Sequence, residues 1–510
     1  MSELFFDPAF LLGELGLAAL IVVLTLADAF RKPLYQLFNG TTQLSELEYR
    51  NRQAGWLTGI GFVIVAALFI YTNKLTGGEP AILLHNSLKA GGGLLIGKLV
   101  ILIAGILTLL LSIRYTSIES IPGIDYYLLL CFSLLGALTL IAAENFIMLF
   151  LALEMMSIPI YAMVGLKRYN PRSDESAIKY LLLGGFSSGF LLLGISFLYG
   201  ATGSLVISDV LTSLSFPTIE LATPQALFGA LGLIFLFIGL AFKVSLVPFH
   251  AWTPDVYEGA ATPITAFMSV AVKLSAFAVI LKIFAGSTSF GGFDSILVGM
   301  LGFFALITVM YGNSVAIVQT NVKRMLAYSS IAHAGYMALA IAPMTHTVDA
   351  AKAVLFYGIG YVAMNMLAFG VLIYLTRQNH YCETLDDLKG VARKFPGAAA
   401  MMTIAMFSLA GIPPAVGFVG KIQIFMQLIN AHMYITAVIA LLFSFVALYF
   451  YINVLVVMYM KEPDTDKTIE SSHQFPVWVA MAASALLIIL LGILPTPLLN
   501  WSQQWASILF

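Results

Sequence analysis

Long apolar runs separated by short polar connections dominate this chain of 510 residues. The run Leu227–Ala241 is typical, because it is continuously apolar and lacks the two-residue alternation of a membrane β-strand. About 20 such residues cross a bilayer as a helix. The pattern predicts an all-α polytopic membrane protein with about fourteen transmembrane helices. The predicted spans are 10–30, 56–72, 94–113, 125–142, 145–166, 176–199, 226–257, 263–285, 296–318, 325–342, 352–375, 396–428, 435–459 and 477–500.

Composition agrees with this pattern, since 60% of the residues are hydrophobic, 10% are charged and the mean hydropathy is +0.94. These values exclude a soluble domain. A formal net charge of −1 gives no reason to expect a nucleic-acid partner. The N-terminus has no basic region before its first apolar run, so we expect 10–30 to be a retained span, not a cleaved signal peptide.

The cysteines and glycines predict no cofactor site on this chain. Cys131 and Cys382 lie far apart and no CxxC pair occurs, which argues against iron–sulfur or zinc binding. No glycine-rich nucleotide fingerprint is recognised between a strand and a helix, and Gly91, Gly92 and Gly93 are expected in a loop before a span. Any redox cofactors should therefore lie on other chains.

Basic residues are distributed unevenly between the connections, which predicts the orientation of the chain. Even-numbered connections contain only Lys74 and Lys89 clearly, and 201–225 contains no basic residue. The odd-numbered connections contain Arg31, Lys32, Arg50, Arg52, Arg114, Lys167, Arg168, Arg172, Lys323, Arg324, Arg377, Lys389, Arg393, Lys394, Lys461 and Lys467. We expect odd connections in the cytoplasm, both termini on the outer (periplasmic) side, and an even number of spans.

Two spans, 226–257 and 396–428, are too long for one straight helix, at about 32 residues each. Proline removes a backbone donor and clashes with the preceding turn, so each run is predicted to be two half-helices. The breaking residues are Pro248 and Pro254 in the first run and Pro413 and Pro414 in the second. Interrupted helices in corresponding positions of two halves indicate an ion or substrate site.

The two interrupted spans are the seventh and the twelfth, and an offset of five inverts the direction of the chain. Topology alone therefore predicts two inverted five-helix repeats, each containing a broken helix. The predicted divisions are a three-helix segment at 1–124, repeats at 125–285 and 286–460, and a last loop and helix at 461–510.

Several ionisable residues lie where lipid would not tolerate them. A charge at a helix centre costs roughly 2.5–3.5 kcal/mol even on the most lenient scale, so such residues are usually functional. Lysine suits a proton relay because burial lowers its pKa readily, a carboxylate holds its proton on, and histidine passes protons between lysines. We therefore predict a proton-translocation site made of Glu154, Lys179, Lys243, Lys273, His333 and Lys421.

Five of these six residues also have an ordinary structural explanation. Lys243, Lys273 and Lys179 are alternatively lysines that extend to the membrane surface, and Lys421 is alternatively a cap after the second break. His333 is alternatively a hydrogen-bond partner of Ser329. Three further residues, Glu144, Lys282 and Lys352, are expected to be a cap and two interface anchors.

Four motifs carry a resemblance that covers nearly the whole chain. They are FKVSLVPFHAWTPDVYEGA at 242–260, EMMSIP at 154–159, NVKRMLAYSSIAHAGY at 321–336, and LAGIP at 409–413 with GFVGK at 417–421. With these residues the chain resembles the antiporter-like N-type membrane subunits of respiratory complex I, the proton-translocating NADH:quinone oxidoreductase. The M type usually has glutamate at the position of Lys421, and the L type carries a long lateral helix, so the N type matches better.

The resemblance implies that Glu154 pairs with Lys243, and that Lys273 and His333 lead to Lys421. It implies a subunit of a translocase that has no cofactor of its own. NADH, FMN, iron–sulfur clusters and quinone would bind partner subunits. The implied partners are M-type, K-type and L-type membrane neighbours, the peripheral arm and the lipid bilayer, in the plasma membrane of a bacterium.

Two other classes of function are kept as alternatives. A subunit of a multisubunit Na⁺/H⁺ antiporter would share the fold, although the motif WTPDVY at 252–257 argues against this class. A passive assembly scaffold would keep pumping after its buried lysines are neutralised. The sequence leaves open the electron donor, the quinone, the coupling ion and the proton entry and exit routes.

Overall fold

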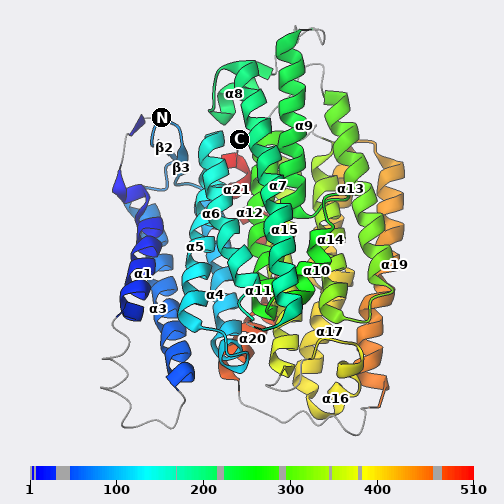
Figure 1. The fold of residues 1–510 in the computed structure, drawn as a ribbon. Coiled ribbons are helices and arrows are strands. Elements are labelled where there is room, and N and C mark those ends of the chain that lie inside the picture. The colour runs from blue at the N-terminus through cyan, green and yellow to red at the C-terminus, as the bar shows by residue number, and fades with distance from the viewer. Residues whose placement is uncertain are drawn as a thin grey trace.

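The structure is a computed structural model that describes residues 3–4, 7–29, 46–167, 169–214, 223–285, 294–343, 347–376, 382–462 and 474–509. These residues form a bundle of mostly parallel and antiparallel helices (Figure 1). The α-helices are α1 (Leu12–Ala29), α3 (Glu46–Leu75), α4 (Leu94–Ile118), α5 (Gly123–Ala142), α6 (Phe146–Val164), α7 (Pro171–Thr202), α8 (Ile207–Leu214), α9 (Pro224–Val244), α10 (Trp252–Gly259), α11 (Thr262–Phe267), α12 (Lys273–Ile280), α13 (Asp294–Ala316), α14 (Val322–Ile341), α15 (Thr347–Leu375), α16 (Val391–Lys394), α17 (Pro396–Ala410), α18 (Val416–Asn430), α19 (Tyr434–Met460), α20 (Phe475–Ile493) and α21 (Thr496–Leu509).

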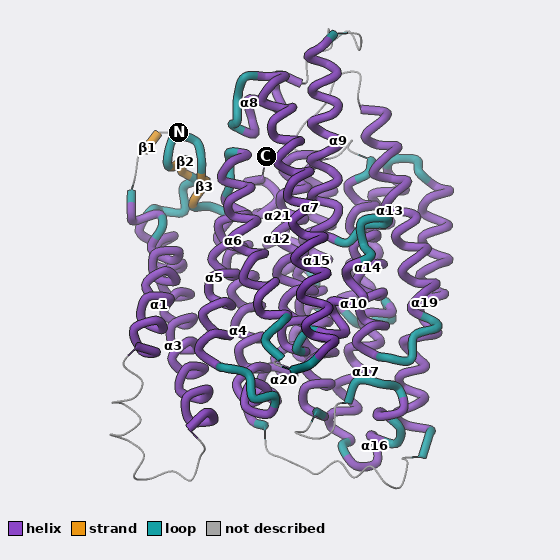
Figure 2. Tube along the Cα trace, viewed as in Figure 1, coloured by secondary structure: helices purple, strands orange, loops and turns teal. Residues whose placement is uncertain are grey.

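Short elements complete the fold. The 3₁₀ turns are η1 (Pro8–Phe10) and η5 (Asp386–Leu388), and the π-helical turns are η2 (Met268–Val272) and η3 (Leu281–Ala285). A small sheet is ordered β1 (Glu3–Leu4), β2 (Ala81–Leu83), β3 (Leu88–Ala90), with β1 parallel to β2 and β3 antiparallel to it. Figure 2 shows these strands at one end of the bundle, near the N-terminus.

Twelve of the described helical segments are long and apolar enough to cross a membrane. They confirm the predicted fold class, an all-helical multi-pass membrane protein. Two further predicted spans correspond to α14 and to the shorter apolar pair α17 and α18. The number fourteen, the inverted repeats and the division at 124, 285 and 460 stay predictions. The basic residues Arg31, Lys32, Arg168, Arg377 and Lys467, used to predict orientation, lie outside the described residues.

The helices at the centre of the bundle differ in burial from those at its edges. Residues 262–285, which comprise α11, η2, α12 and η3, are called the central segment below. Its residues 262–284 are buried on all sides, and α15 is nearly so. Most residues of α1, α3 and α19 are not fully buried, and these helices lie at opposite edges of the bundle in Figure 1. Polar residues of the centre therefore face protein and not lipid, which is where ionisable membrane residues are tolerated.

Both predicted breaks are present. The helix α9 ends at Val244, and Ser245 adopts a left-handed conformation at φ 65° before α10 begins at Trp252. In the second run, α17 ends at Ala410, Gly411 is left-handed at φ 84°, and α18 begins at Val416. Because left-handed residues reverse the helical path, each run becomes two half-helices.

The prolines contribute unequally to these breaks. Pro248 lies in the first gap, and Pro413 and Pro414 lie in the second. Pro254 does not break a helix, and that part of the prediction is wrong. It is the third residue of α10, within the first turn, where a missing N–H loses no intrahelical bond.

Candidate proton-translocation site

Lys243 lies in the last turn of α9, just before the first break, and its side chain is 1% exposed. Its ammonium group donates to Ser157 Oγ and to Tyr161 Oη of α6, both at 2.9 Å. Gly184 of α7 makes room for this arrangement, since a Cβ there would lie 2.3 Å from the Tyr161 hydroxyl oxygen. Lys243 is therefore held by side chains of a neighbouring helix and does not extend to the surface.

Glu154 lies one turn before Ser157 on α6, so the two side chains share one face of the helix. Its carboxylate accepts a hydrogen bond from Ser188 of α7. Among the described residues Glu154 and Lys243 form no direct ion pair, which corrects the contact that the resemblance implied. Instead, the Lys243 ammonium group donates to Ser157 and Tyr161, which follow Glu154 by about one and two turns on α6.

Lys273 is the first residue of α12 in the central segment, and its side chain is 1% exposed. It donates to Ser330 O at 2.8 Å and to Ser330 Oγ at 2.7 Å, so its partner lies on α14. Thr265 and Ser269 precede Lys273 by eight and four residues, a spacing that puts them on one helical face with it. Their hydroxyls nevertheless donate to the backbone carbonyls of Tyr257 and Ala266, respectively.

His333 lies one turn after Ser330 on α14 and is also buried. Its Nδ1 contacts Tyr357 Oη of α15, and its Nε2 lies 3.1 Å from Tyr451 Oη of α19. The Tyr451 hydroxyl also contacts Ser329, so this tyrosine lies between Ser329 and His333. The histidine thus has a hydroxyl at each ring nitrogen, the arrangement that a proton carrier needs.

Lys421 lies on α18, after the second break, and donates to Ala410 O at 2.9 Å and to Ser444 Oγ of α19 at 3.0 Å. The residue at 411 has to be small, because a Cβ there would lie 2.9 Å from Lys421 Cδ. The ammonium group also lies over the ring of Tyr336, 5.3 Å from its centroid. Lys421 therefore does contact the end of a half-helix, as the capping alternative predicted.

Lys179 has a different environment from the other predicted lysines. It lies near the start of α7 with its side chain 41% exposed, and it forms ion pairs with Glu175 at 2.6 Å and Asp255 at 2.8 Å. Arg324 of α14 also pairs with Asp255, at 2.8 Å. Lys179 belongs to a half-exposed ion-pair network around α10, while the other members of the predicted set are in the interior.

The described contacts bring the predicted residues together in two groups. The first group, on α6, α7 and α9, contains Glu154 and Lys243. The second contains Lys273, His333 and Lys421, which all contact residues of α14 or belong to it. No hydrogen bond or ion pair in the described part of the chain joins Lys243 to Lys273.

Other buried lysines have carboxylate partners. Lys282 donates to Glu144 Oε1 at 2.9 Å and to Ala143 O at 2.7 Å, so it is an interior ion pair and not an interface anchor. Nearby on β3, burial lowers the pKa of Lys89; Glu144 acts in the opposite direction and Lys282 adds to the lowering. Within the described residues, Lys243, Lys273 and Lys421 have no carboxylate within 4.0 Å and donate to neutral oxygens.

Sequence reasoning missed several polar partners on other helices. They are Tyr161, Ser188, Tyr357, Ser444 and Tyr451. A signal existed for one helix: Tyr357, Tyr361 and Asn365 recur every four residues in an otherwise apolar run of α15. Lys323 was missed too, because its position in a short connection looked like an ordinary cytoplasmic charge.

No cluster of three or more metal-ligating side chains occurs in the ranges that the structure describes. The two cysteines are buried. The absence of a cofactor from this chain therefore stays a prediction.

Comparisons with known proteins agree with this architecture. The family described as "NADH:quinone oxidoreductase/Mrp antiporter, TM" matches residues 143–447. NADH-quinone oxidoreductase subunit N 1 of Chloroherpeton thalassium is 38% identical over 448 residues, which cover 87% of this chain and 91% of that protein.

Two solved structures show the same fold. A chain of respiratory complex I from Thermus thermophilus is 31% identical and superposes with a TM-score of 0.74. The match covers 96% of this chain and 98% of that one. A chain of the Mrp complex from Dietzia sp. DQ12-45-1b has a TM-score of 0.78 over 99% of this chain and 98% of that one, but is only 17% identical. The second likeness concerns the fold alone.

Proposed function

This chain belongs to the NADH-quinone oxidoreductase subunit N family, and on that premise we propose that it moves protons across a bacterial inner membrane. The route we propose runs from Glu154 and Lys179 through Lys243, Lys273 and His333 to Lys421. The coupling energy would come from quinone reduction elsewhere in a complex I-type enzyme.

One observation carries this proposal: three buried lysines donate only to neutral oxygens in the described structure. A hydroxyl group can accept a hydrogen bond from an ammonium ion and can donate one to a neutral amine after rotation. Such a site holds the lysine in either protonation state. A carboxylate neighbour would instead favour the charged form and hold the proton.

The helix α14 supports the second part of the proposed route. Ser330, His333 and Tyr336 follow one another at intervals of three residues and contact Lys273, Tyr357 and the ammonium group of Lys421, respectively. A proton leaving Lys273 would pass to His333 and then to Lys421. Rotation of the tyrosine hydroxyls, or water between them, would complete the transfers.

We further propose that this chain carries no redox cofactor. NADH, FMN, iron–sulfur clusters and quinone would bind partner subunits in the peripheral arm and membrane. The M-type, K-type and L-type subunits would be its neighbours in the membrane, and both termini would face the periplasm. Gentle solubilisation tests the assembly, because the chain should co-migrate with flavin and iron–sulfur subunits that oxidise NADH.

The test of the relay is Lys243→Ala in the assembled complex, with the exposed Lys74→Ala as control. Protons moved per NADH oxidised should fall sharply in the first variant and stay unchanged in the second. Normal pumping by a fully assembled Lys243→Ala complex would contradict the role of Lys243. Sodium flux without electron input would favour the antiporter alternative.

A further inference from the structure

Lys323 is completely buried at the beginning of α14, where a cation is unfavourable. It is the second residue of this helix, after the N-cap Asn321, whose side chain accepts from Arg324 N at 3.0 Å. Helix N-termini carry a partial positive charge, so a lysine there is repelled by its own helix. The side chain of Lys323 is 0% exposed, so bulk solvent does not offset this cost. The compensation must come from its contacts.

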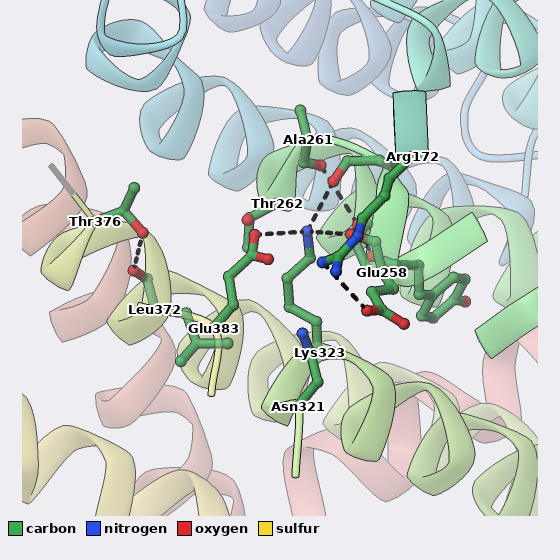
Figure 3. Close-up of polar contacts among 12 residues, drawn as sticks. Arg172, Glu258, Ala261, Thr262, Asn321, Lys323, Leu372, Thr376 and Glu383 are labelled. Carbon is green, nitrogen blue, oxygen red and sulfur yellow. Dashed lines mark hydrogen bonds and ion pairs between the residues drawn. The ribbon is translucent and has the colours of Figure 1, made fainter. Parts of the chain in front are cut away.

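All three donors of the Lys323 ammonium group have partners, and two are backbone carbonyls at one end of another helix. The group donates to Glu258 O at 2.9 Å, to Ala260 O at 2.8 Å and to Glu383 Oε1 at 3.1 Å. Figure 3 shows the lysine between the carboxylate on one side and the chain around Glu258 and Ala261 on the other. The carbonyls at a helix C-terminus attract a cation, so Lys323 caps α10.

The half-helix that Lys323 caps is held closely on its other sides as well. Arg324 pairs with Asp255 at 2.8 Å and with Glu258 at 2.9 Å. From α7, Ser176 Oγ donates to Asp255 O at 2.9 Å. Gly259 packs so closely on α7 that a Cβ there would lie 2.1 Å from Ser176 Oγ. The half-helix α10 is thus held by contacts with the N-terminus of α14 and with the start of α7.

The capped end of α10 is also the beginning of the central segment. Ala260 and Ala261 form the corner, α11 begins at Thr262, and Lys273 follows in the same continuous helical run. On α14, Lys323 and Ser330 are seven residues apart, so they lie on one face two turns apart. α14 therefore holds this run at two points: Lys323 contacts the corner, and Ser330 contacts Lys273.

We propose that Lys323 is a positioning residue that sets the register of the central segment against α14. By fixing the corner at Ala260, it keeps Lys273 within reach of Ser330 and, one turn further along α14, of His333. It also connects the two predicted repeats, since the corner belongs to the first and α14 to the second. This role rests on the relay proposed above, in which Lys273 passes its proton towards His333.

The experiment compares Lys323→Met, Glu383→Gln and the double variant Lys323→Met/Glu383→Gln in the assembled complex. Each is assayed for protons moved per NADH oxidised and for its thermal midpoint. Methionine keeps the length of the side chain and removes its donors. Proton transfer through this chain should fall about tenfold or more in Lys323→Met, since hydrogen bonds to charged groups are among the strongest. Glu383→Gln should pump nearly normally, because both carbonyl contacts remain.

The double variant separates positioning from stability. Removing one partner of a buried ion pair is strongly destabilising, whereas replacing both is often neutral. The double variant should therefore recover the thermal midpoint lost in Lys323→Met but not the proton-to-electron ratio. Recovery of both together would overturn the proposal, because it would show that only an uncompensated carboxylate had mattered. Lys323→Arg, which keeps the charge and several donors, should recover part of the ratio.

Two parallel variants complete the test. Lys352→Met, at a part-exposed lysine near the start of α15, is the matched control and should leave both readouts unchanged. Lys273→Met tests the relay itself. If Lys273→Met fails to pump and Lys323→Met pumps normally, the positioning role is wrong and the relay stands. If Lys273→Met pumps normally, the relay is wrong, and the proposed role of Lys323 in positioning Lys273 is wrong with it.

Discussion

Lys273 and Lys282 lie nine residues apart in the same buried segment, yet their partners differ in kind. Lys273 donates to the carbonyl and hydroxyl of Ser330, both neutral, whereas Lys282 pairs with the carboxylate of Glu144. A paired lysine is held in its charged form, while an unpaired one exchanges its proton at lower cost. The partner of a buried lysine, and not its burial, therefore separates a proposed relay position from a structural one.

The same difference recurs through the molecule. Lys243 and Lys421 resemble Lys273, since each donates to neutral oxygens. Lys98 and Lys323 resemble Lys282, because they pair with Glu14 and Glu383, respectively. Lys323 lies in the first turn of α14, Lys98 is the fifth residue of α4, and Lys282 lies near the end of the central segment. Charge pairs thus stabilise helix ends, and unpaired lysines occur beside helix breaks or in the interior.

The largest effect on pumping is expected from Lys273→Met. A positioned acid or base contributes roughly 10²–10⁴-fold to a proton transfer, so the route through this chain should effectively close. Proton uptake by vesicles, measured against NADH oxidation, should lose the whole share of this subunit. The complex should still assemble, because no carboxylate is left unpaired. Pumping at the normal ratio would remove Lys273 from the relay.

If the type of partner decides the role of a buried lysine, giving Lys273 a carboxylate partner like that of Lys282 should stop it from passing protons. Ser330→Asp places a carboxylate beside Lys273 and should hold its proton. An adjacent opposite charge changes proton affinity by one to three pKa units, so pumping should fall roughly tenfold to a thousandfold. Ser330→Asn is the neutral control of equal size and should pump far better. Equal loss in both variants would mean that the size of the side chain, and not its charge, is responsible.

Lys282→Met should affect stability and not pumping. Removing one partner of a buried ion pair costs about 3–5 kcal/mol, whereas replacing both with neutral residues of similar volume is often neutral. The thermal midpoint of the complex should therefore drop in Lys282→Met and largely recover in Lys282→Met/Glu144→Gln. The proton-to-electron ratio of the assembled complex should stay normal in both. A reduced ratio in the double variant would place Lys282 in the proton route.

Among the variants of the proposed relay, the smallest loss of pumping is expected from Tyr357→Phe, which removes one hydroxyl beside His333 and keeps Tyr451 at the other ring nitrogen. A hydrogen bond of this kind contributes about 0.5–1.5 kcal/mol, so the rate of pumping should fall by a factor of about three to ten. The double variant Tyr357→Phe/Tyr451→Phe should lose far more. If Tyr357→Phe alone stops pumping, Tyr357 is itself a proton carrier. The view that the hydroxyl groups only assist the lysines and His333 would then be wrong.

How much of the site the sequence predicts depends on how far apart in the sequence the interacting residues lie. The lysines were recognisable because a charge within an apolar run is unfavourable wherever the run folds. Their partners were not, because Ser330 lies 57 residues from Lys273 and Tyr161 lies 82 residues from Lys243. Local spacing does not identify the partners, since Thr265 and Ser269 have the spacing of one helical face with Lys273 but donate to the backbone.

By itself, the sequence determined the helical membrane class, the two interrupted runs and the buried ionisable residues. Each follows from local chemistry: the length of apolar runs, residues that cannot continue a helix, and charges that lipid excludes. Only the tertiary structure decided which lysines have carboxylate partners, that Glu154 contacts Ser188 and not Lys243, and that Lys323 is buried. These outcomes depend on how helices distant in sequence pack together, and no local pattern records that packing.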